Sequence, residues 1–138
     1  MKIIYWSGTG NTEKMAELIS KGIEKAGKTA ELISVDSVKI NDILSEDVLI
    51  LGCSAMGDEV LEESTFDPFI EEISDKISGK KVALFGSYGW GDGQWMRDWE
   101  ERMIGYGCIV PEDFLIIQNE PEDDDQDCIE FGQRVALL

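Results

Sequence analysis

Hydrophobic residues in this chain fall into short, mostly continuous runs separated by longer stretches of mixed polarity. Five such runs are predicted strands, at residues 2–6, 29–35, 48–53, 81–85 and 108–117. Short continuous runs are typical of strands that are buried on both faces, as in a parallel sheet. The fifth run is interrupted by Pro111-Glu112-Asp113, so we expect its halves, residues 108–110 and 114–117, to form one broken strand.

The stretches between these runs carry helical spacing. After the first run, one helical face is formed by Met15, Leu18, Ile19, Ile23 and Ala26. Gly27 ends this helix, and further helices are predicted at residues 40–44, 67–77, 94–103 and 123–137. Asp67 is the expected N-cap of the helix at 67–77. Alternating strands and helices predict an α/β fold, with helices on both faces of a five-stranded parallel sheet, in one domain spanning residues 1–138.

Three loops that follow predicted strands are unusual, and all three are expected at the carboxyl edge of the sheet, where ligands bind. The first, Ser7-Gly8-Thr9-Gly10-Asn11-Thr12, joins a strand to a helix N-terminus. Its N–H groups, its hydroxyls and the helix dipole favour an anion. It has no lysine, so it is not the nucleotide P-loop, and neutral donors would hold a phosphate. A simple turn with Asn11 or Thr12 as helix cap is the alternative interpretation of this loop.

The loops after the third and fourth strands add groups that suit a flat ligand. In Ser54-Ala55-Met56-Gly57-Asp58-Glu59, Gly57 permits the positive φ of a type II′ turn. In Ser87-Tyr88-Gly89-Trp90-Gly91-Asp92-Gly93, Trp90 stands between glycines and is poorly placed for a core. An indole at a cleft edge can stack on a planar ring, and the Met56 thioether can cover the other face. Together the loops predict a planar aromatic ligand that carries a phosphate, whereas Trp6 and Trp95 are expected in the core.

The charged residues and cysteines of the chain limit the classes of partner and the cellular setting that we expect. The chain has 12 Lys and Arg against 29 Asp and Glu, a net charge of −17. Such a protein repels nucleic acid and anionic membranes and favours basic protein partners, although solubility alone would also account for the charge. The three cysteines are an odd number without metal-binding spacing, which suits a reducing cytoplasm. The chain opens on a strand rather than a leader, and no apolar run approaches the ~18 residues of a membrane span, so we expect neither secretion nor membrane insertion.

The three loops together closely resemble those of the short-chain flavodoxins of anaerobic bacteria, the clostridial type. The likeness extends over nearly the whole chain and includes its length; the interruption at Pro111–Asp113 departs from it, away from the proposed site. The resemblance implies a flavodoxin-like three-layer sandwich with strand order 2-1-3-4-5 and one non-covalently bound FMN. It also implies a monomer whose partners are redox proteins with basic docking surfaces, such as ferredoxin/flavodoxin-type oxidoreductases.

The same resemblance gives each loop a role. It implies that the Ser7–Thr12 loop, with Ser54, takes the phosphate, and that Met56 and Trp90 flank the isoalloxazine ring. The Gly57 carbonyl would turn toward flavin N5 when the semiquinone forms, and Glu59 would accept a hydrogen bond from N3–H. Backbone groups of the 89–91 segment would meet the pyrimidine edge. The implied cofactor-binding residues are Ser7, Gly8, Thr9, Gly10, Asn11, Thr12, Ser54, Ala55, Met56, Gly57, Asp58, Glu59, Ser87, Tyr88, Gly89, Trp90, Gly91, Asp92 and, near the ribityl chain, Asn119.

These residues indicate an electron carrier rather than an enzyme. The chain has no histidine and no constellation of base, nucleophile or metal ligands for substrate chemistry, so a flavin would supply the reactivity. Acidic residues around the loops, including Asp58, Glu59, Glu62, Glu63 and the acid cluster 120–127, would oppose the second electron. One unit charge at ~10 Å costs about 1.7 kcal/mol at an effective dielectric of 20. We therefore expect a low-potential one-electron carrier that works between semiquinone and hydroquinone.

Three other functions were compared with this one. A phosphoacceptor receiver needs an Asp where the third strand ends, and Cys53 stands there. A low-molecular-weight phosphatase needs Cys and Arg framing its phosphate loop, and the first loop has neither. The alternative that stays open is a flavodoxin-like FMN protein dedicated to one enzyme, such as one that reductively activates a ribonucleotide reductase. The Trp90 loop and the acidic surface favour the general carrier.

Overall fold

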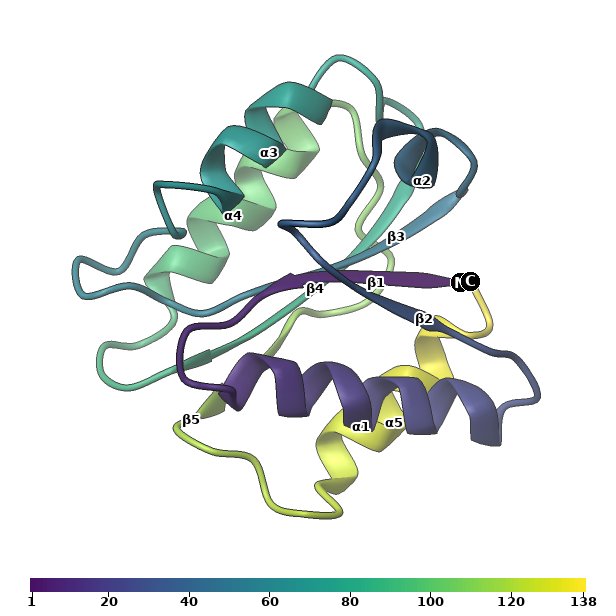
Figure 1. Ribbon diagram of the computed structural model, residues 1–138, viewed down its shortest axis with the longest axis vertical. Helices are drawn as coiled ribbons and strands as arrows, with labels where there is room; N and C mark the ends of the chain where they lie inside the picture. The colour runs from purple at the N-terminus through teal and green to yellow at the C-terminus, as the bar shows by residue number, and fades with distance from the viewer.

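One five-stranded parallel sheet forms the centre of the molecule, in the order β2-β1-β3-β4-β5 (Figure 1). The computed structural model describes residues 1–138. Its strands are β1 (Lys2–Trp6), β2 (Glu31–Ser34), β3 (Val48–Cys53), β4 (Lys81–Tyr88) and β5 (Leu115–Gln118). All four strand pairings are parallel, and β1 lies between β2 and β3. The predicted fold class and strand order are confirmed.

Helices cover both faces of the sheet. They are α1 (Asn11–Lys25), α2 (Ile40–Leu44), α3 (Phe66–Ile73), α4 (Gln94–Gly105) and α5 (Gln126–Val135). Figure 1 shows α1 and α5 together on one face and α3 and α4 together on the other. None of these helices combines the length and apolar character needed to cross a membrane.

The two faces have separate hydrophobic cores because successive side chains of a strand point to opposite sides. Ile3 of β1 packs with Met15 of α1 and Phe131 of α5. Its neighbour Ile4 belongs to the opposite core, with Trp99 of α4. The continuous apolar runs of the sequence are therefore explained by burial on both faces.

Helices α1 and α5 cross at a pair of glycines. A Cβ at Gly132 would overlap the carbonyl oxygen of Ile19, and a Cβ at Gly22 would overlap the carbonyl oxygen of Ile129. Only glycine lets the two backbones approach this closely. This contact sets the position of α1, whose N-terminus follows the first loop.

The strand ends differ from the sequence prediction in length. β4 continues three residues beyond the predicted Phe85 because Gly86, Ser87 and Tyr88 still pair with β5. β2 is shorter than predicted at both ends. The first half of the predicted fifth strand contributes only one isolated bridge, between Lys81 and Ile109, so the break at Pro111–Asp113 is real.

Helix ends also differ, because caps come from residues that the pattern did not indicate. Gly10, at φ 94°, is the N-cap of α1 in place of Asn11 or Thr12, and Ala26 at the other end is exposed. α3 begins one residue before Asp67, which pairs with a cation instead. α5 begins at Gln126, where Asp125 accepts a hydrogen bond from the Cys128 N–H.

Candidate functional site

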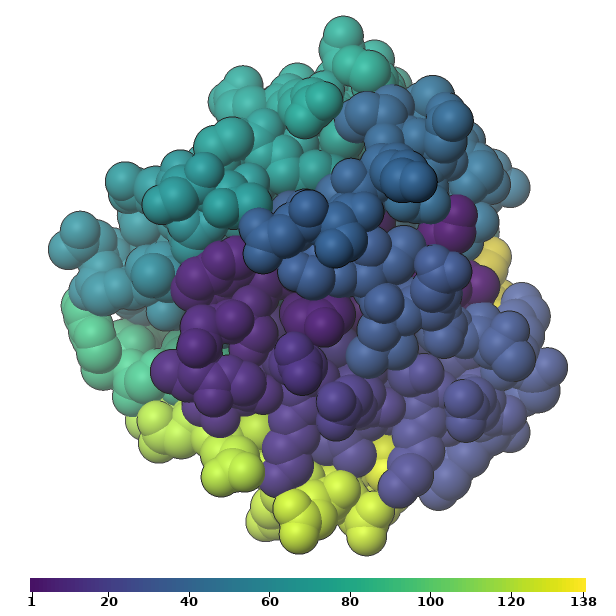
Figure 2. All heavy atoms as spheres, in the orientation of Figure 1, coloured from purple at the N-terminus to yellow at the C-terminus, as the bar shows by residue number.

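Loops from distant parts of the chain meet at the carboxyl edge of the sheet. In Figure 1 the loops after β1, β3, β4 and β5 gather at the left of the view, and Figure 2 shows the segment around the β1 loop adjoining later segments at the surface there. At β1 the order of strands reverses, since β2 lies on one side and β3 on the other. Open α/β sheets bind ligands at such a switch point.

Three hydroxyl groups converge at this edge, one from each of the three loops singled out in the sequence. The Thr12 Oγ1 lies 2.6 Å from the Ser54 Oγ and 3.1 Å from the Ser87 Oγ. Thr12 also accepts a hydrogen bond from the Ser87 N–H at 3.3 Å, and both residues are buried. The predicted meeting of the three loops is therefore confirmed.

The first loop is shaped by Ser7. Its hydroxyl oxygen accepts hydrogen bonds from the Gly10 N–H at 3.1 Å and the Glu13 N–H at 3.3 Å, which turns the chain into α1. The N–H groups of Asn11 and Thr12, in the first turn, have no acceptor within the protein. Free N–H groups at the positive end of a 15-residue helix form an anion site.

A cavity of about 520 Å³ opens beside these groups. Its lining includes most of the predicted cofactor-binding residues: Gly8, Thr9, Asn11, Ser54, Ala55, Met56, Gly57, Ser87, Tyr88, Gly89 and Asn119. Cavities of this size hold a drug-sized or cofactor-sized ligand. Its lining combines hydroxyl side chains with the apolar side chains of Ala55 and Met56 and the ring of Tyr88, as a phosphorylated aromatic ligand requires.

One cavity residue was assigned to the core alone from the sequence. Trp6 packs against the core, but it is only partly buried and also lines the cavity. A Cβ at Gly8 would come within 2.8 Å of the Trp6 ring, so the first loop packs directly on this indole. The signal available in the sequence was its position, since Trp6 is the last residue of β1.

Eight predicted residues lie outside the cavity lining: Ser7, Gly10, Thr12, Asp58, Glu59, Trp90, Gly91 and Asp92. Ser7, Gly10 and Thr12 belong to the first loop and shape it without lining the cavity. Trp90 is 60% exposed and does not face the cavity. Asp92 pairs with Arg97 at 3.0 Å. The structure thus brings most of the predicted residues together and places Trp90 at the surface.

Glu59 has an unsatisfied carboxylate oxygen. Its Oε1 is buried without a hydrogen-bond partner, and it packs so closely on Gly91 that a Cβ there would overlap it. A buried oxygen without a donor is costly, and such atoms in native proteins call for an explanation. A ligand N–H would supply the missing donor.

The loop that contains Glu59 closes on itself. The Met56 N–H donates to the Val60 carbonyl at 3.0 Å, and the Glu59 N–H donates to the Met56 carbonyl at 2.9 Å. The predicted positive φ at Gly57 is wrong for this structure, because the left-handed residue is Glu59, at φ 53°. A Cβ at Gly57 would meet no atom within 4 Å.

Glu62, one of the acids expected around the loops, is buried, with 5% of its surface exposed. Its carboxylate accepts hydrogen bonds from the N–H groups of Ser64, Thr65 and Phe66 at the start of α3. Burial alone would raise the pKa of this carboxyl, but the three N–H donors outweigh it and hold the pKa below the usual value. Glu62 therefore carries a permanent negative charge.

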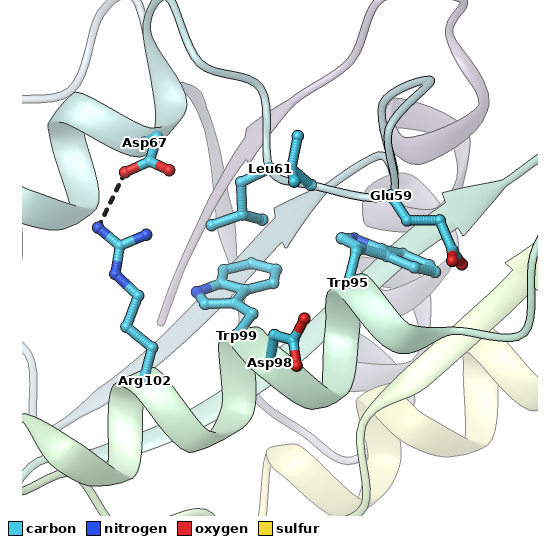
Figure 3. Close-up of a pocket in the computed structure, with 8 residues that line it drawn as sticks. Glu59, Leu61, Asp67, Trp95, Asp98, Trp99 and Arg102 are labelled. Carbon is cyan, nitrogen blue, oxygen red and sulfur yellow. Dashed lines mark hydrogen bonds and ion pairs between the residues drawn. The ribbon is translucent and has the colours of Figure 1, made fainter.

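A second, smaller pocket of about 150 Å³ lies behind the Glu59 loop (Figure 3). Trp95 and Trp99 of α4 form its floor, and Asp67 of α3 pairs with Arg102 of α4 at 2.9 Å across one end. Trp95 is in the core, as predicted. The ion pair fixes α3 to α4 next to the loop.

The cysteines are free and buried. Burial raises the pKa of the Cys53 thiol to about 12 and that of Cys108 to about 11. The reactive thiolate is therefore absent at neutral pH. Cys53, at the end of β3, packs in the core and is not a reactive thiol.

This fold and this site define a class of protein: a doubly wound α/β protein that binds a phosphorylated flat ligand at its switch point. Comparison with known proteins identifies the family. The Flavodoxin family model matches residues 3–132. The chain is 74% identical to the flavodoxin of Clostridium beijerinckii over 138 residues, the whole of both chains. It is 43% identical to the flavodoxin of Megasphaera elsdenii over 136 residues, 99% of this chain and 98% of that one.

A solved structure agrees. The solution structure of two-electron reduced Megasphaera elsdenii flavodoxin superposes with a TM-score of 0.90 over 99% of this chain and 98% of that chain, at 44% identity. The chain belongs to the flavodoxin family. It is a low-potential FMN electron carrier that works with redox partner proteins, and it is not a substrate-converting enzyme. Nothing in these relatives favours the alternative of a flavoprotein dedicated to one enzyme.

Proposed function

We propose that FMN lies in the 520 Å³ cavity with its phosphate on the first loop. The free N–H groups at the start of α1, the Thr9 hydroxyl and the hydroxyl cluster of Thr12, Ser54 and Ser87 would hold it. Met56 and Tyr88 line the cavity, and Trp90, which is exposed and follows the lining residue Gly89, would have to turn toward the cavity to cover the ring. Asn119, at φ 60°, also lines the cavity and would lie next to the ribityl chain. The observation that best supports this position of FMN is that hydroxyl groups from three loops converge at one helix N-terminus.

Two further features suit FMN, one of them on Glu59, which lines the smaller pocket next to the cavity loop rather than the cavity itself. The unpaired Oε1 of Glu59 is an acceptor that suits the N3–H of the flavin. No lysine or arginine lines the cavity, so the phosphate would keep its charge. When bound, FMN accepts and releases electrons one at a time. The protein residues position the cofactor and set the electrostatic field around it.

Acids of the Glu59 loop add to that field without a neutralising partner. Some acids elsewhere are paired: Lys14 pairs with Glu120 and Asp123, and Lys21 pairs with Asp124. Asp58, Glu59, Glu62 and Glu63 form no ion pair. The segment 58–63 therefore contributes unpaired charge, next to the cavity residue Gly57, that would oppose the second electron.

Titration of FMN-free protein with FMN tests the site directly. We expect one FMN per chain and quenching of flavin fluorescence, because the ring stacks on aromatic side chains. Riboflavin, which lacks the phosphate, is expected to bind more weakly because it cannot use the first loop. Equal affinity for the two flavins would contradict the assignment of the phosphate.

We further propose that the partners are oxidoreductases with basic docking surfaces, which the unpaired acids near the cavity would attract. The rate of electron transfer to such a partner is expected to fall steeply as ionic strength rises from about 0.01 M to 0.15 M, since the Debye length shrinks from about 30 Å to 8 Å. Stopped-flow measurement at several salt concentrations checks this. A rate independent of salt would contradict electrostatic docking.

The remaining proposals concern the chain as a whole. We infer a single FMN-binding domain across residues 1–138, supported by one continuous sheet. A monomer is supported by the net charge of −17, since like-charged copies repel each other. A cytoplasmic location is supported by three free, buried thiols.

A further inference from the structure

Glu62 is an unusual carboxylate, because it is buried without a cation. Its Oε2 accepts the Ser64 N–H at 2.6 Å, and its Oε1 accepts the N–H groups of Thr65 at 2.7 Å and Phe66 at 3.0 Å. Only 5% of the residue is exposed. Hydrogen bonds to an ionised acceptor are stronger than neutral ones. The side chain is therefore tightly held against the N-terminus of α3.

The backbone of Glu62 is fixed as well. Its carbonyl accepts the Asp67 N–H at 2.8 Å. Its neighbour Leu61 lies over the Trp99 indole, and Asp67 is paired with Arg102 (Figure 3). Glu62 thus joins the end of the loop to α3 and, through its neighbours, to α4.

The loop from Met56 to Val60 depends on this fixed point. Its internal hydrogen bonds close it on itself, and Gly57, Asp58 and Val60 are exposed. At its first end the Ala55 N–H donates to the Ser87 carbonyl on β4 at 3.0 Å. At its other end, the first residue after Val60 that hydrogen-bonds outside the loop is Glu62. The loop is therefore held between β4 and the Glu62 carboxylate.

We propose that Glu62 is a positioning residue for the redox reaction: its buried carboxylate anchors the Met56–Val60 loop against α3 and so fixes where Glu59 and the Gly57 carbonyl meet the flavin. This inference rests on the proposed binding of FMN in the adjoining cavity. Glu62 touches no part of that cavity and acts only through the loop. A loosened loop would hold the two reduced forms of the flavin less selectively.

The test is Glu62→Gln in the FMN-loaded protein. The amide keeps the size of the side chain but replaces an acceptor oxygen with an N–H₂ group that faces backbone N–H donors. We expect the ratio of the equilibrium constants for the two one-electron reductions to change by about tenfold, so that the two midpoint potentials move about 59 mV closer together. Potentiometric titration followed by absorbance measures this.

Two matched variants separate positioning from charge and from stability. Glu63→Gln removes the same charge from the exposed neighbour, and Asp42→Asn weakens a carboxylate that accepts the Lys39 N–H at the far end of the sheet. Asp42→Asn is expected to change the ratio by less than about twofold because of its distance from the cavity. Glu63→Gln removes one of the acids that oppose the second electron, but it is expected to change the ratio by no more than about threefold, since an exposed charge is screened. Glu62→Gln with a lowered unfolding temperature but unchanged potentials would reduce Glu62 to a helix cap and overturn the proposal.

A second variant, with a shorter carboxylate, tests the proposal even if Glu62→Gln does not fold. Glu62→Asp keeps the charge but shortens the reach to α3, and we expect it to change the ratio by about threefold, between wild type and Glu62→Gln. Unchanged potentials in Glu62→Asp would overturn the proposal as well. Failure of the wild-type protein to bind FMN would instead overturn the proposed function. The two failures can therefore be told apart.

Discussion

Thr9→Asp is expected to lower the affinity for FMN by about two to three powers of ten and to leave riboflavin binding nearly unchanged. Thr9 lines the cavity in the first loop and is exposed, so the substitution adds a charge without disturbing the core. A second negative charge about 5 Å from the phosphate costs about 3 kcal/mol at an effective dielectric of 20. Fluorescence titration with the two flavins measures both affinities.

The matched control is Thr29→Asp, which adds the same charge at an exposed position just before β2. It is expected to change FMN affinity by less than about threefold, as a distant, screened charge should. Loss of riboflavin binding in Thr9→Asp would show damage to the loop rather than repulsion. Unchanged FMN affinity in Thr9→Asp would show that the phosphate does not bind at the first loop.

Gly132→Ala is expected to destabilise the fold by about 3 kcal/mol, a large part of the 5–15 kcal/mol that holds a domain together. The added methyl group would overlap the Ile19 carbonyl oxygen, which belongs to backbone and cannot rotate away. Helices α1 and α5 would have to separate, exposing Met15 and Phe131 to water. Denaturant unfolding of the FMN-free protein measures the loss.

Gly105→Ala is the control for this substitution. Gly105 ends α4, and a Cβ there would meet no atom within 4 Å. Alanine is favoured over glycine in a helix, so we expect a gain of about 0.5–1 kcal/mol. A Gly132→Ala protein as stable as wild type would mean that the helices can part without cost, and the close crossing would lose its structural role.

The sequence predicted the fold because local and tertiary signals agree. Strands such as Val48–Cys53 are apolar throughout, since both faces are buried, and Trp95 and Trp99 share the helical face that meets the sheet. The hydroxyl cluster could also be expected, because parallel strands end at one edge. Thr12, Ser54 and Ser87 each follow or end a different strand there.

What the sequence could not predict depends on contacts between distant residues. Nothing local distinguishes Glu62 from the exposed Glu63 beside it; only the turn into α3 buries one carboxylate among backbone donors. Trp6 was assigned to the core because its strand is apolar, yet it ends β1 at the cavity. The positive φ expected at Gly57 falls at Glu59, where hydrogen bonds with Met56 and Val60 shape the loop.

We infer that the unpaired acids near the cavity lower the midpoint potential at which bound FMN accepts its second electron. Spectroelectrochemical titration of the FMN-loaded protein tests it most directly. We predict two resolved one-electron steps, with the second well below that of free FMN, because each 1.4 kcal/mol of charge repulsion lowers it by about 59 mV. Coincident steps, or a second potential equal to that of free FMN, would contradict the account.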